Sequence, residues 1–552
     1  MFKKHKKIKV AGLFSVLVIT LVSFTTPTER YFEIAKNLDI FATLFKEVNA
    51  YYVDEIDPDE IIRVGIDAML ASLDPYTNYI PEDEIESFRS MTTGQYAGIG
   101  ALIGQINNKT IITMPYKDFA AYNAGLKIGD EIIAINGKKV IGMSVSDIST
   151  LLKGQARTKV AVQVKRFGFE EPLNFVFNRE KITVTNVPYY GKVATDIGYV
   201  KLEDFTTDAG KEVAKAVEGL KEQGVKKIIL DLRGNPGGLL SEAVNVSNIF
   251  IPKNQEVVST KGKVTEWNKT YKTLNRPLDT DIPLAVLIDG GSASASEIVS
   301  GVMQDYDRGI LIGSKTFGKG LVQATRPLTY NSQLKVTTAK YYIPSGRCIQ
   351  SLDYTHRDDN GDVHKIVDSL RTQFATANGR IVYDGSGLAP DVKVKRETYA
   401  PITISLLSKG LIFEYATQYA HKRKSIPEAA AFEPTDAEYL AFKQWLSTKN
   451  YDYTTRVETD LVKLEESAKK EKHYKEIEDM LNDLNEKVKH NKEQDLEIFK
   501  NEIKHVLRVE IASRYYLQKG SIEASFANDE AVKEAVEIFN DPDTYQQLLS
   551  GK

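Results

Sequence analysis

The chain has 552 residues, of which 42% are apolar and 27% are charged, and its formal net charge is −3. This length exceeds what one hydrophobic core usually supports, so three or four domains are expected. The near-neutral charge gives no sign of the basic surface on which nucleic-acid binding depends. A single cysteine, Cys348, excludes an intrachain disulfide.

The N-terminus is typical of an export signal. A basic stretch, "KKHKKIK", precedes an apolar run from Val10 to Phe24. The run is short for a membrane-spanning helix, which needs about 20 residues. "SFTT" is a poor cleavage site, which leaves open whether the segment is removed or kept as a membrane anchor. We assign residues 1–28 to a signal peptide or anchor and expect the protein in the periplasm or on the periplasmic face of the inner membrane.

Four regions follow in chain order. Residues 29–92 have a helical pattern, and residues 93–182 alternate short apolar runs with Gly/Asn turns, as in a small β-rich domain. In residues 183–400 the buried-strand patterns "IGYVKL", "KKIILDL", "PLAVLID" and "GILIG" alternate with helical ones. Residues 401–552 are helical and rich in charge. The predicted fold class is multidomain α/β.

One glycine-rich loop resembles a phosphate-binding loop. "GSKTFGKG", residues 313–320, follows a strand pattern and places Lys319 in the lysine position of that loop. Gly320 stands where a Ser or Thr would hold Mg²⁺, and the next residues contain β-branched side chains and a proline rather than a helix start. The sequence therefore argues against nucleotide binding, and Lys319 needs another explanation.

A second loop, "GGSASASEIVSG", places serines at the start of a predicted helix. Ser294 and Glu297 have the spacing of a capping box, which is a purely structural role. A helix N-terminus also suits a nucleophile, because the free amide of Ala295 and the helix dipole favour a developing oxyanion. The residues alone are compatible with both roles.

A serine nucleophile needs a base, and histidine is the usual one. No histidine lies between His5 and His356, and His356 and His364 fall in a polar segment expected to be a solvated hairpin or loop. A lysine can replace histidine if burial lowers its pKa, which makes Lys319 a candidate. A third loop, "DLRGNPGG" (231–238), is either a second source of oxyanion donors or a simple strand-to-helix turn.

These motifs together resemble the C-terminal processing (tail-specific) serine peptidases. The resemblance covers roughly residues 41–394 and rests on "DLRGNPGG", "GSASASEI", "MQDYDRG", "TFGKGLVQ" and "GSGLAPDV" in this order. It implies an α/β core of the ClpP/crotonase type with an inserted PDZ domain, and a Ser/Lys dyad. The roles it implies are Ser294 as nucleophile, Lys319 as base, Gln323 as the residue that orients the lysine, Asp305 as a structural support, and Ala295 with Gly238 or Gly237 as oxyanion donors. Gly238 is the favoured choice of the two glycines.

Residues 93–182 then resemble the PDZ domain of this family. "YAGIGALIG" is similar to the loop that binds a free carboxylate, so Tyr96, Ala97, Gly98, Ile99 and Gly100 are expected at the peptide site. The expected function is a serine endopeptidase, without metal or nucleotide, that recognises apolar C-terminal tails of exported proteins and cleaves them. The alternative is a non-catalytic PDZ scaffold or adaptor. An adaptor, a second copy of the chain and membrane contact through the N-terminal segment remain open as partners; nucleic acid is not expected.

Overall fold

The structure, a computed structural model, describes residues 27–358, 361–395, 398–488 and 492–551. It divides into two compact units, residues 1–79 and 80–552. In the first unit, helix α2 (Pro27–Tyr51) is followed by α3 (Pro58–Ala71), whose N-terminus is capped by Asp57. The predicted signal or anchor lies outside the described residues, except for positions 27 and 28. Among the helices that are described, none combines the length and the apolar character needed to cross a membrane.

The α/β region of the second unit is built on one sheet, with strands in the order β10-β11-β12-β15-β16-β23. All neighbours pair in parallel except β10, which is antiparallel to β11. The strands are β10 (Tyr189–Lys192), β11 (Ile197–Lys201), β12 (Lys227–Asp231), β15 (Leu284–Ile288), β16 (Ile310–Gly313) and β23 (Val392–Lys393). The four strands predicted from apolar runs are β11, β12, β15 and β16.

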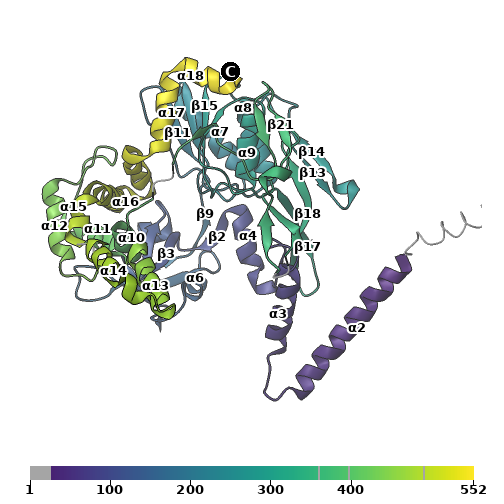
Figure 1. The fold of residues 1–552 in the computed structure, drawn as a ribbon, viewed down its shortest axis with the longest axis horizontal. Helices are drawn as coiled ribbons and strands as arrows, with labels where there is room; N and C mark the ends of the chain where they lie inside the picture. Colours follow the sequence, from purple (N-terminus) through teal and green to yellow (C-terminus); the bar gives the residue numbers. More distant parts are fainter. Residues whose placement is uncertain (1–26, 359–360, 396–397, 489–491, 552) are drawn as a thin grey trace, which may run out of the picture. The chain divides into compact units, whose positions relative to one another are not determined.

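The two faces of this sheet are covered by different parts of the chain (Figure 1). Side chains alternate along each strand, so Val200, Leu230 and Val286 lie on one face and Tyr199, Ile229 on the other. The first face packs against the helices between the strands, which are α7 (Ala209–Glu222), α8 (Leu240–Phe250) and α9 (Ala295–Asp305). The second face packs against α17 (Glu530–Asn540) and α18 (Pro542–Ser550), at the C-terminal end of the chain.

A second sheet lies beside the first and contains β13 (Glu256–Gly262), β14 (Lys269–Lys272), β17 (Leu321–Pro327) and β18 (Gln333–Tyr342), paired antiparallel. Its strand β17 begins two residues after Lys319. The segment after the "GSKTFGKG" loop is therefore a strand, in agreement with the argument against a phosphate loop, which requires a helix there.

The β-rich region, which is expected to be a PDZ domain, is inserted through a two-stranded ribbon. β2 (Gln95–Gly98) enters and β9 (Glu180–Thr183) leaves, and the two pair antiparallel. Between them a sheet runs in the order β3-β4-β5-β7-β8, with a short strand β6 paired to β5. The strands are β3 (Ala101–Ile106), β4 (Lys109–Pro115), β5 (Glu131–Ile135), β6 (Lys138–Lys139), β7 (Lys159–Lys165) and β8 (Leu173–Asn178). Helix α6 (Val145–Leu152) packs near β3.

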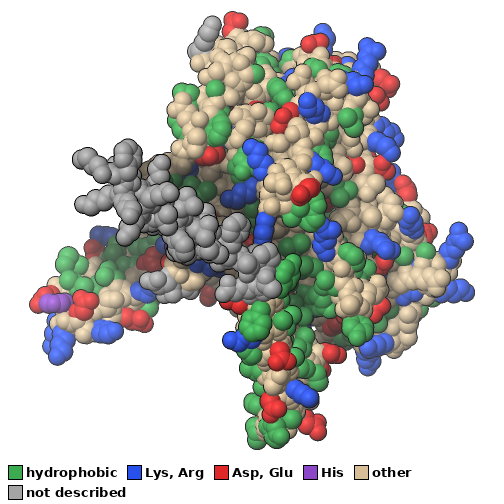
Figure 2. All heavy atoms as spheres, turned by 90° about the vertical axis from the view of Figure 1, so that its right-hand side faces the viewer, with side chains coloured by type: hydrophobic (Ala, Val, Ile, Leu, Met, Phe, Trp, Pro, Cys, Tyr) green, Lys and Arg blue, Asp and Glu red, His purple; other side chains and the backbone are tan. Residues whose placement is uncertain are grey.

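The region after residue 400 has a hydrophobic core of its own, in which Leu406, Ile412, Phe442 and Leu507 are almost completely buried. The helices that supply this core are α10 (Pro401–Ser408), α11 (Leu411–Lys422), α12 (Asp436–Leu446), α15 (Lys492–Ile498) and α16 (Lys500–Ser525). Helices α13 (Arg456–Lys470) and α14 (Tyr474–Val488) pack against each other. Charged side chains of both signs are scattered over the face of the molecule drawn in Figure 2, in keeping with the net charge of −3.

Candidate active site

The predicted nucleophile, Ser294, occupies the N-cap position of α9, directly after the loop that follows β15. Its backbone has φ 55° and ψ −113°, a conformation that residues other than glycine rarely adopt. The side chain is half-buried, whereas Ala293 and Ala295 on either side are buried. A strained serine at a helix N-terminus is therefore presented at the edge of the core, with the amide of Ala295 at the first helical position.

One buried carboxylate connects Ser294 to Lys319. The Oε2 atom of Glu297 accepts hydrogen bonds from the backbone amides of Ser294 and Lys319, both at 2.9 Å. Its Oε1 atom accepts from the amide of Gly318 at 2.8 Å and from the hydroxyl of Thr316 at 2.5 Å. Two residues that are far apart in the sequence thus share one acceptor atom, which holds their backbones close together.

Glu297 is completely buried and accepts hydrogen bonds from three backbone amides and one hydroxyl. Burial raises its pKa from 4.5 to about 7, although the four hydrogen bonds oppose the shift. The sequence predicted this residue as one half of a capping box with Ser294, and the bond from the Ser294 amide is present. Its contact with the Lys319 loop was missed, because S-x-x-E spacing carries no information about a distant loop.

The glycines beside Lys319 allow a close approach of another segment. A Cβ on Gly318 would lie 2.6 Å from Ser351, and one on Gly320 would lie 2.8 Å from the backbone nitrogen of Gln350. The amide of Gly320 donates to Gln350 Oε1 at 2.7 Å, and the amide of Ser351 donates to the carbonyl of Gly318 at 2.9 Å. The loop that contains Lys319 is therefore held between Glu297 on one side and Gln350 and Ser351, at the start of the polar segment, on the other.

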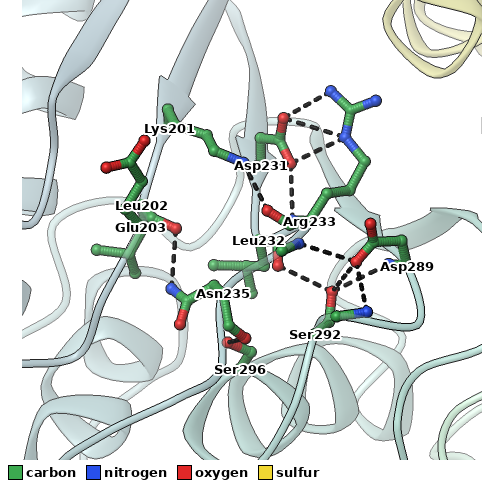
Figure 3. Close-up of polar contacts among 12 residues, drawn as sticks. Lys201, Leu202, Glu203, Asp231, Leu232, Arg233, Asn235, Asp289, Ser292 and Ser296 are labelled. Carbon is green, nitrogen blue, oxygen red and sulfur yellow. Dashed lines mark hydrogen bonds and ion pairs between the residues drawn. The ribbon is translucent and has the colours of Figure 1, made fainter. Parts of the chain in front are cut away.

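The third loop, "DLRGNPGG", lies against the nucleophile. A Cβ on Gly237, where φ is 99°, would come within 2.8 Å of the Cβ of Ser294. Asn235 joins the loop to the nucleophile segment, because its carbonyl accepts from the amide of Ala293 at 3.0 Å and from the hydroxyl of Ser296 at 2.9 Å. Figure 3 shows Asn235 beside Ser296 and the hydrogen bond from its side chain to Leu202. The loop is thus more than a strand-to-helix turn.

The two candidate glycines differ in what their amides do. The amide of Gly237 donates to Oδ1 of Asn235 at 2.9 Å, so it is already used inside the loop. Gly238 follows, with φ 151°. The residues on either side of it bond to Phe205: the amide of Phe205 donates to the carbonyl of Gly237, and the amide of Leu239 donates to the carbonyl of Phe205. The amide of Gly238 donates none of the hydrogen bonds formed among the described residues. This difference favours Gly238 as the second oxyanion donor.

The remaining predicted site residues, Gln323 and Asp305, form hydrogen bonds and ion pairs with other residues. Gln323, in β17, donates from its side chain to the hydroxyl of Thr337 at 3.2 Å. Asp305, at the opposite end of α9 from Ser294, forms a buried ion pair with Arg347 at 2.7 Å and accepts from the amide of Ser345. Burial raises the pKa of Asp305 even though Arg347 opposes the shift. Asp305 therefore anchors α9 without reaching its N-terminus.

The two histidines of the polar segment, His356 and His364, lie on the surface. His356 and His364 belong to a hairpin of β19 (Leu352–Arg357) and β20 (Val363–Lys365), and each pairs with an aspartate nearby in the sequence. Their side chains are 86% and 68% exposed. This confirms the expectation of a solvated hairpin. Within the described parts of the chain, no group of three or more His, Cys, Asp or Glu side chains is arranged to hold a metal ion.

The predicted carboxylate loop precedes the edge strand of the PDZ sheet. Tyr96, Ala97 and Gly98 lie in β2, and Ile99 and Gly100 connect it to β3. The carbonyls of Ile99 and Gly100 accept from Ala121 and Tyr116, so the connection is fixed by the domain itself. β3 pairs only with β4 in its sheet and has α6 nearby, which leaves one strand edge beside a helix.

Comparisons with known proteins agree with these features. The model of "Peptidase family S41" matches residues 196–355, "PDZ domain" matches 111–166, and "Probable PDZ-protease, C-terminal helical domain" matches 402–539. A "Carboxy-terminal-processing protease" of Bartonella bacilliformis is 37% identical over 63% of this chain and 80% of that protein. A "Probable CtpA-like serine protease" of Staphylococcus aureus is 36% identical over 62% of this chain and 69% of that protein.

Solved structures include a photosystem II D1 C-terminal processing protease, 26% identical, which covers 64% of this chain and 92% of that one with a TM-score of 0.35. The PDZ domain of a carboxy-terminal protease from Vibrio cholerae, solved in complex with a peptide, is 29% identical and covers 16% of this chain and 99% of that one, with a TM-score of 0.16. The assignment of this chain to a family is based on the matching family models and on the relatives that are 36–37% identical in sequence. This chain belongs to the carboxy-terminal-processing serine proteases of peptidase family S41, with a PDZ domain and a C-terminal helical domain.

Proposed function

We propose that this protease is an exported endopeptidase that cleaves near protein C-termini with Ser294 as nucleophile and Lys319 as general base. The observation that carries the proposal is the shared acceptor: one oxygen of Glu297 binds the backbone amides of both residues at 2.9 Å. A dyad works only if nucleophile and base keep a fixed separation, and a single buried acceptor supplies that constraint.

The reaction begins when Ser294 Oγ attacks the scissile carbonyl carbon and its proton passes to neutral Lys319 Nζ. The carbonyl oxygen becomes an oxyanion, which accepts hydrogen bonds from the amides of Ala295 and Gly238. Lys319 then returns the proton to the leaving amine nitrogen as the C–N bond breaks, and an acyl-enzyme ester remains on Ser294. Water attacks this ester with Lys319 again as base, which releases the new C-terminal carboxylate and restores Ser294.

The substrate tail is proposed to bind the PDZ domain by strand addition. The open edge of β3 offers backbone hydrogen bonds, and residues 96–100 precede it in the position of a carboxylate-binding loop. An apolar C-terminal side chain would enter the space between β3 and α6. Gln323 is proposed to orient Lys319 once substrate is bound. Export is proposed from the basic and apolar N-terminal pattern.

The test is cleavage of an unfolded substrate that ends in an apolar tail. Ser294→Ala and Lys319→Ala should each lower kcat by about 10⁴-fold or more, because nucleophile and base act as one unit. Ser300→Ala, on the same helix, and Lys315→Ala, on the same loop as Lys319, are the matched controls and should retain activity. Cleavage that survives Ser294→Ala would reject the dyad.

The competing function is a PDZ scaffold without catalysis. It predicts that wild-type protein binds the apolar tail but releases no product, and that Ser294→Ala changes nothing. A substrate with an amidated C-terminus separates tail capture from catalysis: weaker binding with an unchanged kcat would place carboxylate recognition in the PDZ domain.

A further inference from the structure

The C-terminal helical region makes a buried contact with the "DLRGNPGG" loop. Asp529, at the N-cap of α17, receives two hydrogen bonds from Arg233: Nη1 to Oδ1 at 2.9 Å and Nη2 to Oδ2 at 2.7 Å. The side chains are only 24% and 15% exposed. This bidentate geometry fixes the guanidinium in its plane as well as in position.

Arg233 is also held from the other side, by the end of strand β12. Its Nη2 lies 2.6 Å from Oδ2 of Asp231, and its backbone carbonyl accepts from Lys201 Nζ at 2.6 Å. Figure 3 shows Lys201, Asp231 and Arg233 converging at the start of the loop. Arg233 thus connects strand β12 to helix α17. The "DLRGNPGG" loop continues from Arg233 to Gly238.

The same C-terminal segment contacts a second support of the loop. Gln518 donates to both carboxylate oxygens of Glu203, at 2.9 and 3.1 Å. Two residues later, Phe205 donates to the carbonyl of Gly237 at 3.1 Å and accepts from the amide of Leu239 at 2.8 Å. Residues 518–529 therefore contact the loop in two ways: Asp529 binds Arg233 directly, and Gln518 binds Glu203, which is close in sequence to Phe205 beside Gly237 and Leu239.

We propose that Asp529 is a positioning residue of the peptidase: it holds Arg233 so that the amide of Gly238 points at the oxyanion. This rests on the proposed role of Gly238. It assigns to the C-terminal helical domain an indirect part in catalysis, in addition to its part in covering the sheet. The carboxylate acts through Arg233 and the loop and touches neither substrate nor the reacting atoms.

The test uses Asp529→Asn in the full-length chain. Asparagine is as good an N-cap as aspartate, so α17 keeps its cap while the charge that binds Arg233 is lost. Asp541→Asn is the matched control, because Asp541 caps α18 through the amide of Thr544 in the same helical layer. The measurements are kcat and KM for a peptide with an apolar tail, affinity for a peptide boronate, and the thermal unfolding midpoint.

The expected result is that Asp529→Asn lowers kcat by about 10-fold or more, less than the loss of an entire oxyanion donor. KM should change by less than about twofold, and boronate affinity should fall by a similar factor as kcat, because the boronate forms a tetrahedral adduct that needs the same amides. Asp541→Asn should change none of these. Adding Asp529→Asn to Arg233→Ala should cause little further loss, because the two residues act as one unit.

Two results would overturn the proposal. The first is a kcat for Asp529→Asn within twofold of wild type. The second is a loss of activity that follows the folded fraction in the melting curve, with boronate affinity per folded molecule unchanged, because that describes a structural role alone. Ser294→Ala, measured in parallel, keeps the two proposals apart: activity in that variant would reject the dyad, whereas its inactivity beside a fully active Asp529→Asn would reject only the positioning role.

Discussion

Two buried carboxylates flank the candidate catalytic centre, and their surroundings give them opposite properties. Glu297 has four uncharged donors, and burial raises its pKa to about 7. Asp231 is equally buried, which would also raise its pKa, but Arg233 and Lys201 lower it below its ordinary value of 3.8. At Asp231 the two cations outweigh the effect of burial on the pKa, whereas at Glu297 the four hydrogen bonds do not.

The opposite pKa shifts of Asp231 and Glu297 suit the two carboxylates to different functions. Asp231 is ionised at neutral pH, binds two cations and secures the end of β12. Glu297 can gain or lose a proton near neutral pH, and it contacts the backbones of Ser294 and Lys319. The first site is therefore suited to stability, and the second would make the geometry of the proposed dyad sensitive to pH.

The largest expected effect is on stability and concerns the anion with cations. Asp231→Ala leaves Lys201 and one side of Arg233 without a counter-ion in a buried site, which should lower the free energy of unfolding by about 3 kcal/mol. Urea titration measures it. Asp196→Ala is the control, because the partly exposed pair of Asp196 with Lys227 should contribute less than about 1 kcal/mol. Equal losses in both variants would show that burial of the Asp231 pair is unimportant.

The next effect is on catalysis and concerns Glu297. Glu297→Gln replaces an oxygen acceptor by an NH₂ group that faces backbone donors, so kcat should fall about 10²-fold through misplacement of the dyad. In the wild-type enzyme, activity should rise with pH through about 7 as Glu297 ionises and accepts all four bonds. Glu297→Gln should lack this limb. A rise near pH 7 that persists in the variant would assign it to another group, such as Lys319.

The signs for stability are opposite at the two sites. Glu297 binds its proton more tightly in the folded state, so its contribution to stability falls as pH rises from about 4.5 to about 7. Asp231 binds its proton less tightly in the folded state, so its contribution is present above about pH 4 and is lost as pH falls through the folded pKa. Asp231→Ala should therefore flatten the acid side of the stability curve, which urea titrations at several pH values measure.

The smallest effects come from removing one hydroxyl at each site. Thr316→Val deletes a donor to Glu297, and Tyr199→Phe deletes a donor to Asp231 at 2.6 Å; each should cost about 1 kcal/mol of stability. Only Thr316→Val should move the activity limb to higher pH, because its hydroxyl lowers the pKa of Glu297. Activity profiles recorded side by side test this. The same shift in Tyr199→Phe would mean that the two carboxylates are coupled.

Local sequence patterns predicted several strands and a helix N-terminus, because the alternation of buried and exposed positions along an element is visible in the order of its residues. The patterns "IGYVKL", "KKIILDL", "PLAVLID" and "GILIG" predicted β11, β12, β15 and β16, and Ser294 at the start of a helical pattern predicted the N-terminus of α9. The missing hydroxyl at Gly320 and the absence of histidine between positions 5 and 356 directed attention to Lys319. These inferences need only residue identity and spacing.

The sequence by itself determined four strands of the parallel sheet, the start of helix α9, the family, and which serine and lysine are the candidates for catalysis. Only the tertiary structure decided that Glu297 joins the two loops, that Asn235 occupies the amide of Gly237, and that α17 and α18 cover the second face of the sheet. The pairing of Arg233 with Asp529 spans 296 residues. Such contacts depend on the path of the whole chain, whereas a local pattern records only which side of an element is buried.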